Sequence, residues 1–242
     1  MTAPPRPRSR LDRTRTALRL LRLRVELPLL FRRASLPELL ARAAPAGGAA
    51  PPAALDDVQR AAERLLRPLR FWRTTCLWRA LGGYSALRAA GADVRFLIGV
   101  RMDERGELAA HAWLERDGRP SLGAPRPDAG YTVAFAWPAD EGTLRPEVRR
   151  VAGIVPSKDA VLTELRDGTG VLLHLDTKFY FTLNRTGVLA WKLLGEEGAR
   201  DAAELGDRLA RSFPDADPAA VRADVAALVA ELLREKLVLQ AG

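Results

Sequence analysis

The sequence predicts an α+β protein built from two domains. Helical patterns fill most of residues 16–90, whereas extended patterns fill residues 94–137, and this order is typical of helices segregated from an antiparallel sheet. A stretch rich in proline and glycine, residues 138–157, then precedes a second plan of three short strands followed by three helices. A chain of 242 residues is long enough for one large domain or two small ones.

Composition and charge describe an ordinary soluble protein, with 48% hydrophobic and 28% charged residues. The formal net charge is +8, and it comes almost entirely from arginine. One interpretation is a solvated basic face. The other is attraction to an acidic peptide, a membrane surface or nucleic acid. Lysine occurs only at Lys158, Lys178, Lys192 and Lys236.

Several classes of protein are disfavoured by the sequence. The apolar run from Val25 to Phe31 is short and contains Glu26 and Pro28, whereas a membrane span needs about 20 apolar residues. We expect no secretion signal. A single cysteine and two histidines leave no internal disulfide and make a zinc site unexpected. The prediction is a cytoplasmic protein with no membrane span, no metal and no cofactor.

The helices of the first domain follow a basic tail. Residues 1–15 are rich in proline, arginine, serine and threonine, so we expect them to be disordered. Residues 16–43 are predicted helical, with a capping box from Ser35 to Glu38 that starts a second piece. After a flexible linker, apolar spacing predicts a helix over 55–68. A further helix over 76–90 ends before Gly91.

The strands of the first domain come next and include a hairpin. Asp117-Gly118 is a two-residue turn signal between extended segments, so Arg116 should pair with Arg119. The predicted strands are 94–100, 108–116, 119–122 and 131–137. Residues 16–137 therefore form the first domain, and 138–157 the linker.

The second domain, residues 158–242, has strands and helices in separate blocks. Three strands and three helices in about 80 residues predict a winged-helix-like domain. Asp217 followed by Pro218 is a cap and first-turn pair for the last helix. The strands are expected at 161–165, 171–175 and 179–183, and the helices at 185–195, 201–212 and 218–236.

Cys76 and His111 form the candidate chemical site. Thr74 or Thr75 is a suitable N-cap, which places Cys76 in the first turn of a helix, where free N–H groups favour a thiolate and can bind an oxyanion. His111 lies on a strand with Ala109 and Trp113 on the same face. This arrangement is that of papain-like and transglutaminase-like enzymes. The alternative is a small buried thiol and an unrelated imidazole.

The residue that orients His111 is left open by the hairpin geometry. The predicted register places residues 122–124 beside His111, and no carboxylate occurs there. Asp117 lies in the turn, roughly 20 Å along the strand. Asp128 lies just beyond the expected place and is the preferred candidate. A Cys-His dyad, or a backbone carbonyl that orients the histidine, are the alternatives.

Three segments of the first domain together resemble the lasso-peptide leader peptidases, which are transglutaminase-like cysteine peptidases. The resemblance covers about residues 16–137 and implies that Cys76 is the nucleophile and His111 the general base and acid. The family's aspartate follows the histidine by about a dozen residues, where this chain has Gly123. The matching segments are Trp72 to Ala80, Leu87 to Arg101 and His111 to Gly118.

The segment from Asp167 to Gly187, with Trp191, resembles the PqqD-like precursor-recognition domains, and the similarity runs over about residues 160–240. The resemblance implies that a leader peptide binds as an added strand on the third strand, packed against the third helix. Trp191 is expected in the core and His174 on the surface. The implied binding residues are Phe179, Tyr180, Phe181, Thr182 and Leu183 of the strand, with Leu228 and Leu232 of the helix.

The two resemblances predict a leader peptidase of ribosomal peptide (lasso peptide) biosynthesis. The second domain would capture the leader of a precursor peptide, and Cys76 would cleave leader from core through a thioester. An ATP-dependent macrolactam synthetase would be a further partner. One alternative is a catalytically inactive leader-binding chaperone. The other is a winged-helix DNA-binding protein, which the few basic residues of the last helix disfavour.

Overall fold

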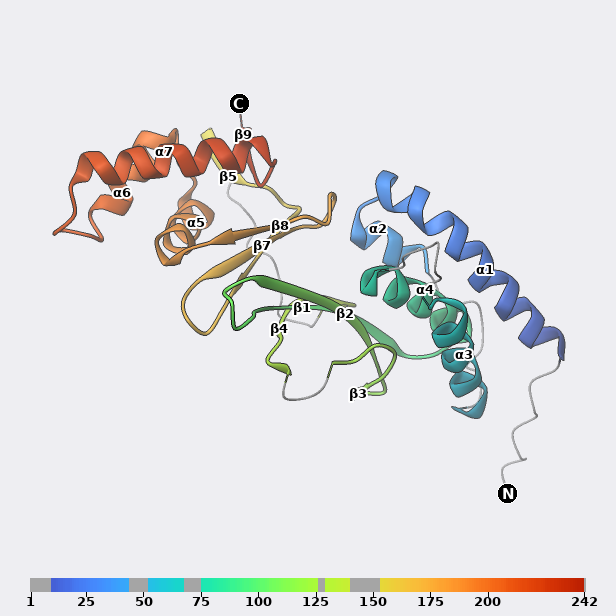
Figure 1. Cartoon of the computed structure of the whole chain (residues 1–242). Coiled ribbons are helices and arrows are strands. Elements are labelled where there is room, and N and C mark those ends of the chain that lie inside the picture. Colours follow the sequence, from blue (N-terminus) through green and yellow to red (C-terminus); the bar gives the residue numbers. More distant parts are fainter. Residues whose placement is uncertain (1–9, 44–51, 68–74, 126–128, 140–152, 242) are drawn as a thin grey trace, which may run out of the picture. The chain divides into compact units, whose positions relative to one another are not determined.

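The computed structural model describes residues 10–43, 52–67, 75–125, 129–139 and 153–241, and the chain divides into two compact units (Figure 1). The first unit is Met1–Asp140 and the second is Glu141–Gly242. Each combines helices with antiparallel strands, so the predicted α+β class is confirmed.

The helices of the first unit begin earlier than composition predicted. Helix α1 (Arg10–Arg33) starts inside the segment 1–15 that we expected to be disordered, and residues 1–9 lie outside the described part. The capping box is confirmed, since Ser35 N–H donates to Glu38 Oε2 over 2.9 Å and Glu38 N–H donates to Ser35 Oγ over 3.5 Å. The other helices are α2 (Leu36–Ala41), α3 (Pro52–Leu65) and α4 (Cys76–Ala89).

The sheet of the first unit has the order β3-β2-β1-β4. The hairpin of β2 and β3, at one edge of this sheet, has the predicted register, with Arg116 opposite Arg119. Asp117 and Gly118 have φ values of 53° and 70°, as a two-residue turn of this twist requires. The strands are β1 (Val94–Met102), β2 (Leu108–Arg116), β3 (Arg119–Pro120) and β4 (Thr132–Trp137).

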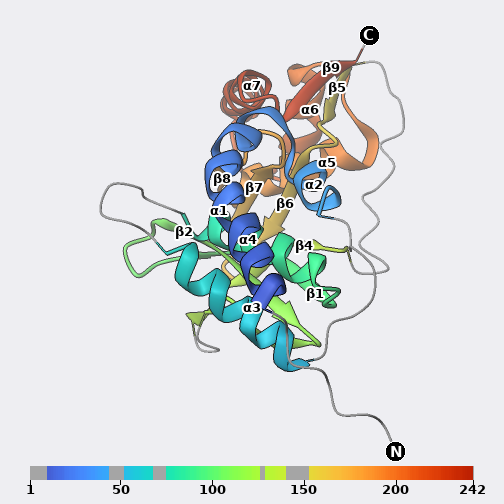
Figure 2. The same cartoon turned by 90° about the vertical axis from the view of Figure 1, so that its right-hand side faces the viewer.

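Helix α4 lies against β1 and β2, and α1 and α3 pack on it (Figure 2). Gly83 allows a close approach to the sheet. A Cβ at Gly83 would overlap Leu122 Cδ2 and would lie 3.2 Å from Leu114 Cδ1. Glycine inside a helix costs about 0.5–1 kcal/mol relative to alanine. The close packing that it permits brings the N-terminus of α4, where Cys76 lies, next to β2.

The described residues of the second unit form two small sheets and three helices. The three-stranded sheet has the order β6-β7-β8, and β5 pairs with β9 in a separate two-stranded sheet. The strands are β5 (Gly153–Pro156), β6 (Ala160–Glu164), β7 (Gly170–His174), β8 (Tyr180–Leu183) and β9 (Val238–Ala241). The helices are α5 (Arg185–Glu197), α6 (Ala202–Ala210) and α7 (Pro218–Arg234).

Two expectations for this part of the chain are corrected. The predicted linker 138–157 contains strand β5, and the last helix ends at Arg234 rather than near residue 236. The chain then continues as β9, which pairs with β5 in antiparallel register from Pro156↔Val238 to Gly153↔Ala241. The second unit thus closes on itself by pairing its first and last strands.

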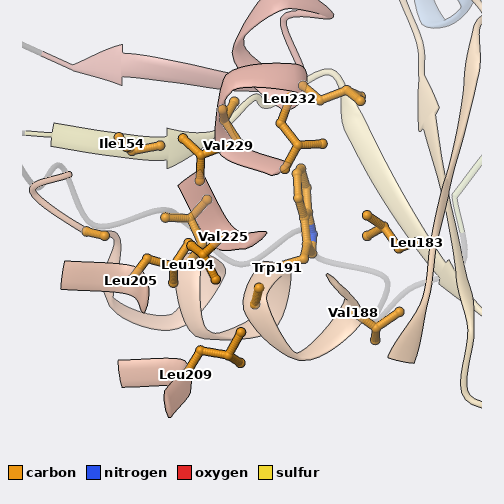
Figure 3. Packing of buried hydrophobic residues seen from close by; sticks show 14 of the residues in the cluster. Ile154, Leu183, Val188, Trp191, Leu194, Leu205, Leu209, Val225, Val229 and Leu232 are labelled. Carbon is orange, nitrogen blue, oxygen red and sulfur yellow. The ribbon is translucent and has the colours of Figure 1, made fainter. Parts of the chain in front are cut away.

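The core of the second unit is arranged around Trp191, as the sequence predicted. The Trp191 side chain is 8% exposed and lies between α7 and the end of β8, near Leu183 and Leu232 (Figure 3). Helices α5, α6 and α7 all contribute to this cluster. The packed core holds β8 in place. The edge of β8 that faces away from β7 is the outer edge of the three-stranded sheet.

Candidate active site

Cys76 is the first residue of α4. Thr75 has extended backbone angles, and its hydroxyl oxygen accepts a hydrogen bond from Trp78 N–H over 3.3 Å. The predicted N-cap is therefore Thr75. The Cys76 side chain is half-buried and lies in the first turn of the helix, where N–H groups have no acceptor within the helix. A thiolate, or an oxyanion formed beside it, is favoured at this place because those N–H groups and the helix dipole carry partial positive charge.

His111 lies on β2, opposite Gly99 of β1. Its Nε2 is 2.7 Å from the carbonyl oxygen of Gly123. A carbonyl only accepts hydrogen bonds, so Nε2 carries the proton in this contact, and in the neutral imidazole Nδ1 keeps its lone pair. The imidazole is thus held in the tautomer that can take a proton from a thiol at Nδ1.

The two residues line the same small cavity, although they are 35 positions apart in the chain. The cavity lies between the first turn of α4 and the edge of β2, and it contains Cys76, Arg79, Ala80, His111, Ala112, Leu122 and Gly123. A thiol, an imidazole with a free Nδ1 and the N–H groups of a helix terminus therefore meet at one place. These are the groups that acyl transfer through a thioester requires.

The structure distinguishes among the candidates for the group that orients His111. Asp117 lies in the hairpin turn, where its carboxylate is 3.7 Å from Arg116 Nε and its side chain is 71% exposed, so it does not orient His111. Asp128 lies outside the described residues. Gly123, at the position where the resemblance placed an aspartate, supplies its backbone carbonyl instead. Of the alternatives, the described residues therefore support a backbone carbonyl.

An aromatic wall holds the His111 ring from the side. The imidazole is stacked on Trp113, with ring centroids 6.2 Å apart, and Tyr131 packs against it at 5.8 Å. The Arg101 guanidinium lies 5.3 Å above the Tyr131 ring. Trp113 was expected on the histidine's face, whereas Tyr131 and Arg101 were not predicted as its neighbours, because only the pairing of β4 with β1 brings Tyr131 close.

Gly99 leaves the space that the Trp113 ring occupies, so replacing Gly99 tests the role of these aromatic contacts. A Cβ at position 99 would lie 2.7 Å and 2.8 Å from two indole carbons of Trp113. We expect Gly99→Val to displace Trp113 and to lower the free energy of unfolding by about 1–3 kcal/mol. The rate of the reaction that depends on His111 should fall even in samples that remain folded. Thermal unfolding and turnover measured on the same samples check this. Gly195→Val is the control, because nothing lies within 4 Å of a Cβ there and the backbone is that of helix α5.

A second candidate site lies in the other unit, along the outer edge of β8. In the described residues no strand pairs with this edge, because the sheet order ends at β8. Phe179 O accepts from His174 N–H, so by the alternation of an antiparallel ladder the backbone groups of Thr182 point away from β7. The edge can therefore accept another strand.

A groove of about 610 Å³ runs between this edge and α7. Its apolar lining includes Phe181 and Leu183 of the sheet and Val221 and Leu228 of the helix. Strand, groove and helix thus form a surface on which an extended peptide could add as a strand and place side chains in the groove.

The predicted binding residues do not all face this groove. Phe181, Thr182, Leu183 and Leu228 line it, whereas Phe179 is 56% exposed and precedes β8. Leu232 is 3% exposed and belongs to the hydrophobic core, so its prediction as a binding residue is not supported. Asp224 and Glu231 also line the groove and were missed. The available signal was their spacing around Leu228, at one helical turn on either side.

His174 is buried, contrary to the expectation of a surface position. It is 5% exposed, and its Nδ1 accepts hydrogen bonds from the N–H groups of Asp176 and Thr177 at 3.2 Å and 3.4 Å. The buried ring therefore holds the backbone of the turn between β7 and β8. Its role is therefore to support the start of the edge strand.

The described part of the chain offers neither a metal site nor a membrane span. There, no group of three or more histidine, cysteine, aspartate or glutamate side chains could hold a metal ion. Among the same residues no helix is both long and apolar enough to cross a membrane.

Comparisons with known proteins agree with this division of the chain. Residues 8–136 match the sequence profile of the transglutaminase-like superfamily. Residues 169–238 match that of coenzyme PQQ synthesis protein D (PqqD). A solved structure described as TbiB1 in complex with the TbiA(beta) leader peptide is 31% identical, covers 35% of this chain and 93% of its own, and has a TM-score of 0.31. No curated protein matched the chain.

Proposed function

Because this chain belongs to the transglutaminase-like superfamily and carries a C-terminal PqqD domain, we propose that it is a cysteine peptidase that removes the leader of a ribosomally made precursor peptide. The product class that we infer is the lasso peptides. The observation that carries the proposal is the contact between His111 Nε2 and the Gly123 carbonyl, in the cavity that Cys76 also lines. It supports an imidazole prepared to accept the thiol proton.

The proposed acylation uses only groups of that cavity. His111 Nδ1 takes the proton from Cys76 Sγ, and the thiolate attacks the carbonyl carbon of the last leader residue. The N–H groups at the start of α4 stabilise the resulting oxyanion. As the C–N bond breaks, the imidazolium returns the proton to the departing amine of the core peptide. The leader remains bound to Sγ as a thioester.

Water completes the reaction. His111 Nδ1 takes a proton from the water molecule that attacks the thioester carbonyl, and the C–S bond breaks. The proton then returns to the thiolate, so the leader leaves with a free carboxylate and the enzyme is regenerated. The core peptide carries a new N-terminal amine. A partner enzyme that closes a macrolactam at the expense of ATP would use this amine.

The PqqD domain is proposed to supply the substrate. A leader that adds to β8 would be held by backbone hydrogen bonds, with side chains in the groove between β8 and α7. The segment between the two domains would then keep the leader at a high effective concentration near Cys76. Binding and cleavage would use different parts of one chain.

The groove gives a direct test of substrate capture. We expect Leu228→Arg to weaken leader binding by at least about tenfold, because it places a charge among the groove's apolar side chains, and to change thermal stability little since Leu228 is only half-buried. The contrasting variant is Leu232→Ala, which should destabilise by about 2–5 kcal/mol because that side chain is in the core. Fluorescence anisotropy and thermal unfolding separate the two effects.

A single experiment tests the whole proposal. The precursor peptide encoded next to this protein's gene is incubated with the wild-type chain, and the products are identified by mass spectrometry. Two fragments that correspond to leader and core support the peptidase. An intact peptide that nevertheless binds would favour the second candidate, a leader-binding protein without activity. That candidate is motivated by the observation that no carboxylate among the described residues lines the Cys76 cavity.

The DNA-binding alternative finds little support in α7. Its arginines are engaged with carboxylates, since Arg222 pairs with Asp207 and Arg234 pairs with Glu231 and Glu235. A helix that binds phosphates needs basic side chains that face outward without such partners. The last helix is therefore better suited to line the peptide groove.

A further inference from the structure

The groove between β8 and α7 has an acidic wall. Asp224, Leu228 and Glu231 occupy positions i, i+4 and i+7 of α7 and therefore lie on one face of the helix. All three line the groove. The only charged side chains among the described residues that line it are these two carboxylates. This is notable in a chain whose net charge is +8.

The two carboxylates differ in their surroundings. Glu231 is 3.2 Å from Arg234 Nη2, so it already has an ionic partner on its own helix. Asp224 has no ion pair with any described residue. The nearest arginine in sequence on the same helix, Arg222, is turned toward α6, where it pairs with Asp207. Asp224 is therefore the carboxylate that can pair with a positively charged side chain of a bound peptide.

We propose that this groove selects leader peptides that carry a lysine or arginine two positions from their apolar anchor, and that Asp224 makes the selection. The inference rests on the proposed function, since it assumes that a leader strand occupies the groove. The anchor is the apolar side chain that packs on Leu228. The basic side chain lies opposite Asp224, at the rim.

The helix geometry fixes the spacing of the two leader residues. Asp224 and Leu228 are four residues apart, or about 6 Å along the helix axis. A strand advances about 3.3 Å per residue, and every second side chain points to the same face. A leader strand that runs parallel to α7 along the groove therefore presents its basic residue two positions from the anchor. A basic residue one position away would face out of the groove.

The first test uses no knowledge of the natural leader. Random 12-residue peptides displayed on phage are selected against the full-length wild-type chain and against Asp224→Lys. We expect wild-type binders to be enriched in lysine or arginine two positions from an aliphatic or aromatic residue. Against Asp224→Lys this preference should disappear or change to acidic residues. Apolar binders without any basic preference would overturn the inference and leave the proposed function intact.

The second test measures the size of the effect. The most enriched peptide is labelled and titrated by fluorescence anisotropy. We expect Asp224→Asn to weaken binding about two- to fivefold, as for an exposed ion pair, and Asp224→Lys to weaken it about tenfold. Asp215→Asn is the matched control, because Asp215 is an exposed carboxylate outside the groove, and it should leave binding unchanged. Replacing the peptide's basic residue by glutamate should restore binding to Asp224→Lys.

Failure of the proposed function would give a different result. Leu228→Arg should lose the selected peptides altogether. If it retains them, the peptides bind elsewhere and the groove is not the leader site. If the wild-type chain enriches no peptide, the groove does not capture extended segments, and both the inference and the capture step fail. Equal binding by wild type, Asp224→Asn and Asp224→Lys would overturn the inference alone.

Discussion

Replacement of Cys76 by alanine is expected to abolish leader cleavage, with a loss of about 10⁴-fold or more. The proposed thioester forms on Cys76 Sγ, and this chain has no other cysteine that could replace it. Cys76→Ser should be almost as inactive, because a serine hydroxyl is a much weaker nucleophile than a thiolate. Mass spectrometry of the precursor over time measures both variants.

Binding is the control for this variant. The leader groove belongs to the second unit, so Cys76→Ala should bind the leader as tightly as the wild type does. The wild-type chain treated with iodoacetamide should also lose activity, since Cys76 is the single alkylation site. Full cleavage by Cys76→Ala would show that the cavity at the start of α4 is not the active site.

Replacement of His111 by alanine is expected to lower the cleavage rate by about 10²–10⁴-fold, the usual contribution of a positioned general base and acid. The cleavage rate should fall further than it does in a variant that only lowers stability, because His111 acts in both acylation and hydrolysis. Its ring lies against Trp113 and Tyr131, so thermal unfolding must be measured alongside. Unchanged cleavage by a folded His111→Ala chain would contradict the proposed mechanism.

A companion variant identifies the group that orients His111. If the Gly123 carbonyl is that group, Asp128→Ala should retain cleavage within about threefold, because His111 Nε2 already has its acceptor at 2.7 Å. A loss of about 100-fold or more, with the fold intact, would instead assign Asp128 as the orienting carboxylate. Asp117→Ala serves as the control, since Asp117 lies at the far end of the hairpin.

Much of the candidate active site was predictable from short sequence segments. Thr75 next to Cys76 indicated a helix start, and Asp117-Gly118 indicated a two-residue turn. Because the turn sets the register of the hairpin, the sequence alone predicts that the backbone near residues 122–124 lies beside His111. What the pattern left open was which atom there would contact the ring.

The second unit shows where such patterns fail. His174 alternates with leucines, which suggested the surface, but β7 is the central strand of its sheet and all five of its residues are buried. Leu232 shares an apolar stripe with Leu228, yet one faces the core and the other the groove. Periodicity identifies an apolar face but does not identify its neighbour.

Local hydrogen bonding and side-chain periodicity depend on residues a few positions apart, so helix caps, the hairpin turn and the order of elements could be inferred from the chain alone. Long-range packing decided the rest. Cys76 meets His111 because glycine lets α4 approach the sheet, β5 finds β9 across about 80 residues, and the groove exists because α7 packs beside the edge of β8. Such contacts depend on how whole elements fill space together, and no short stretch of sequence encodes that.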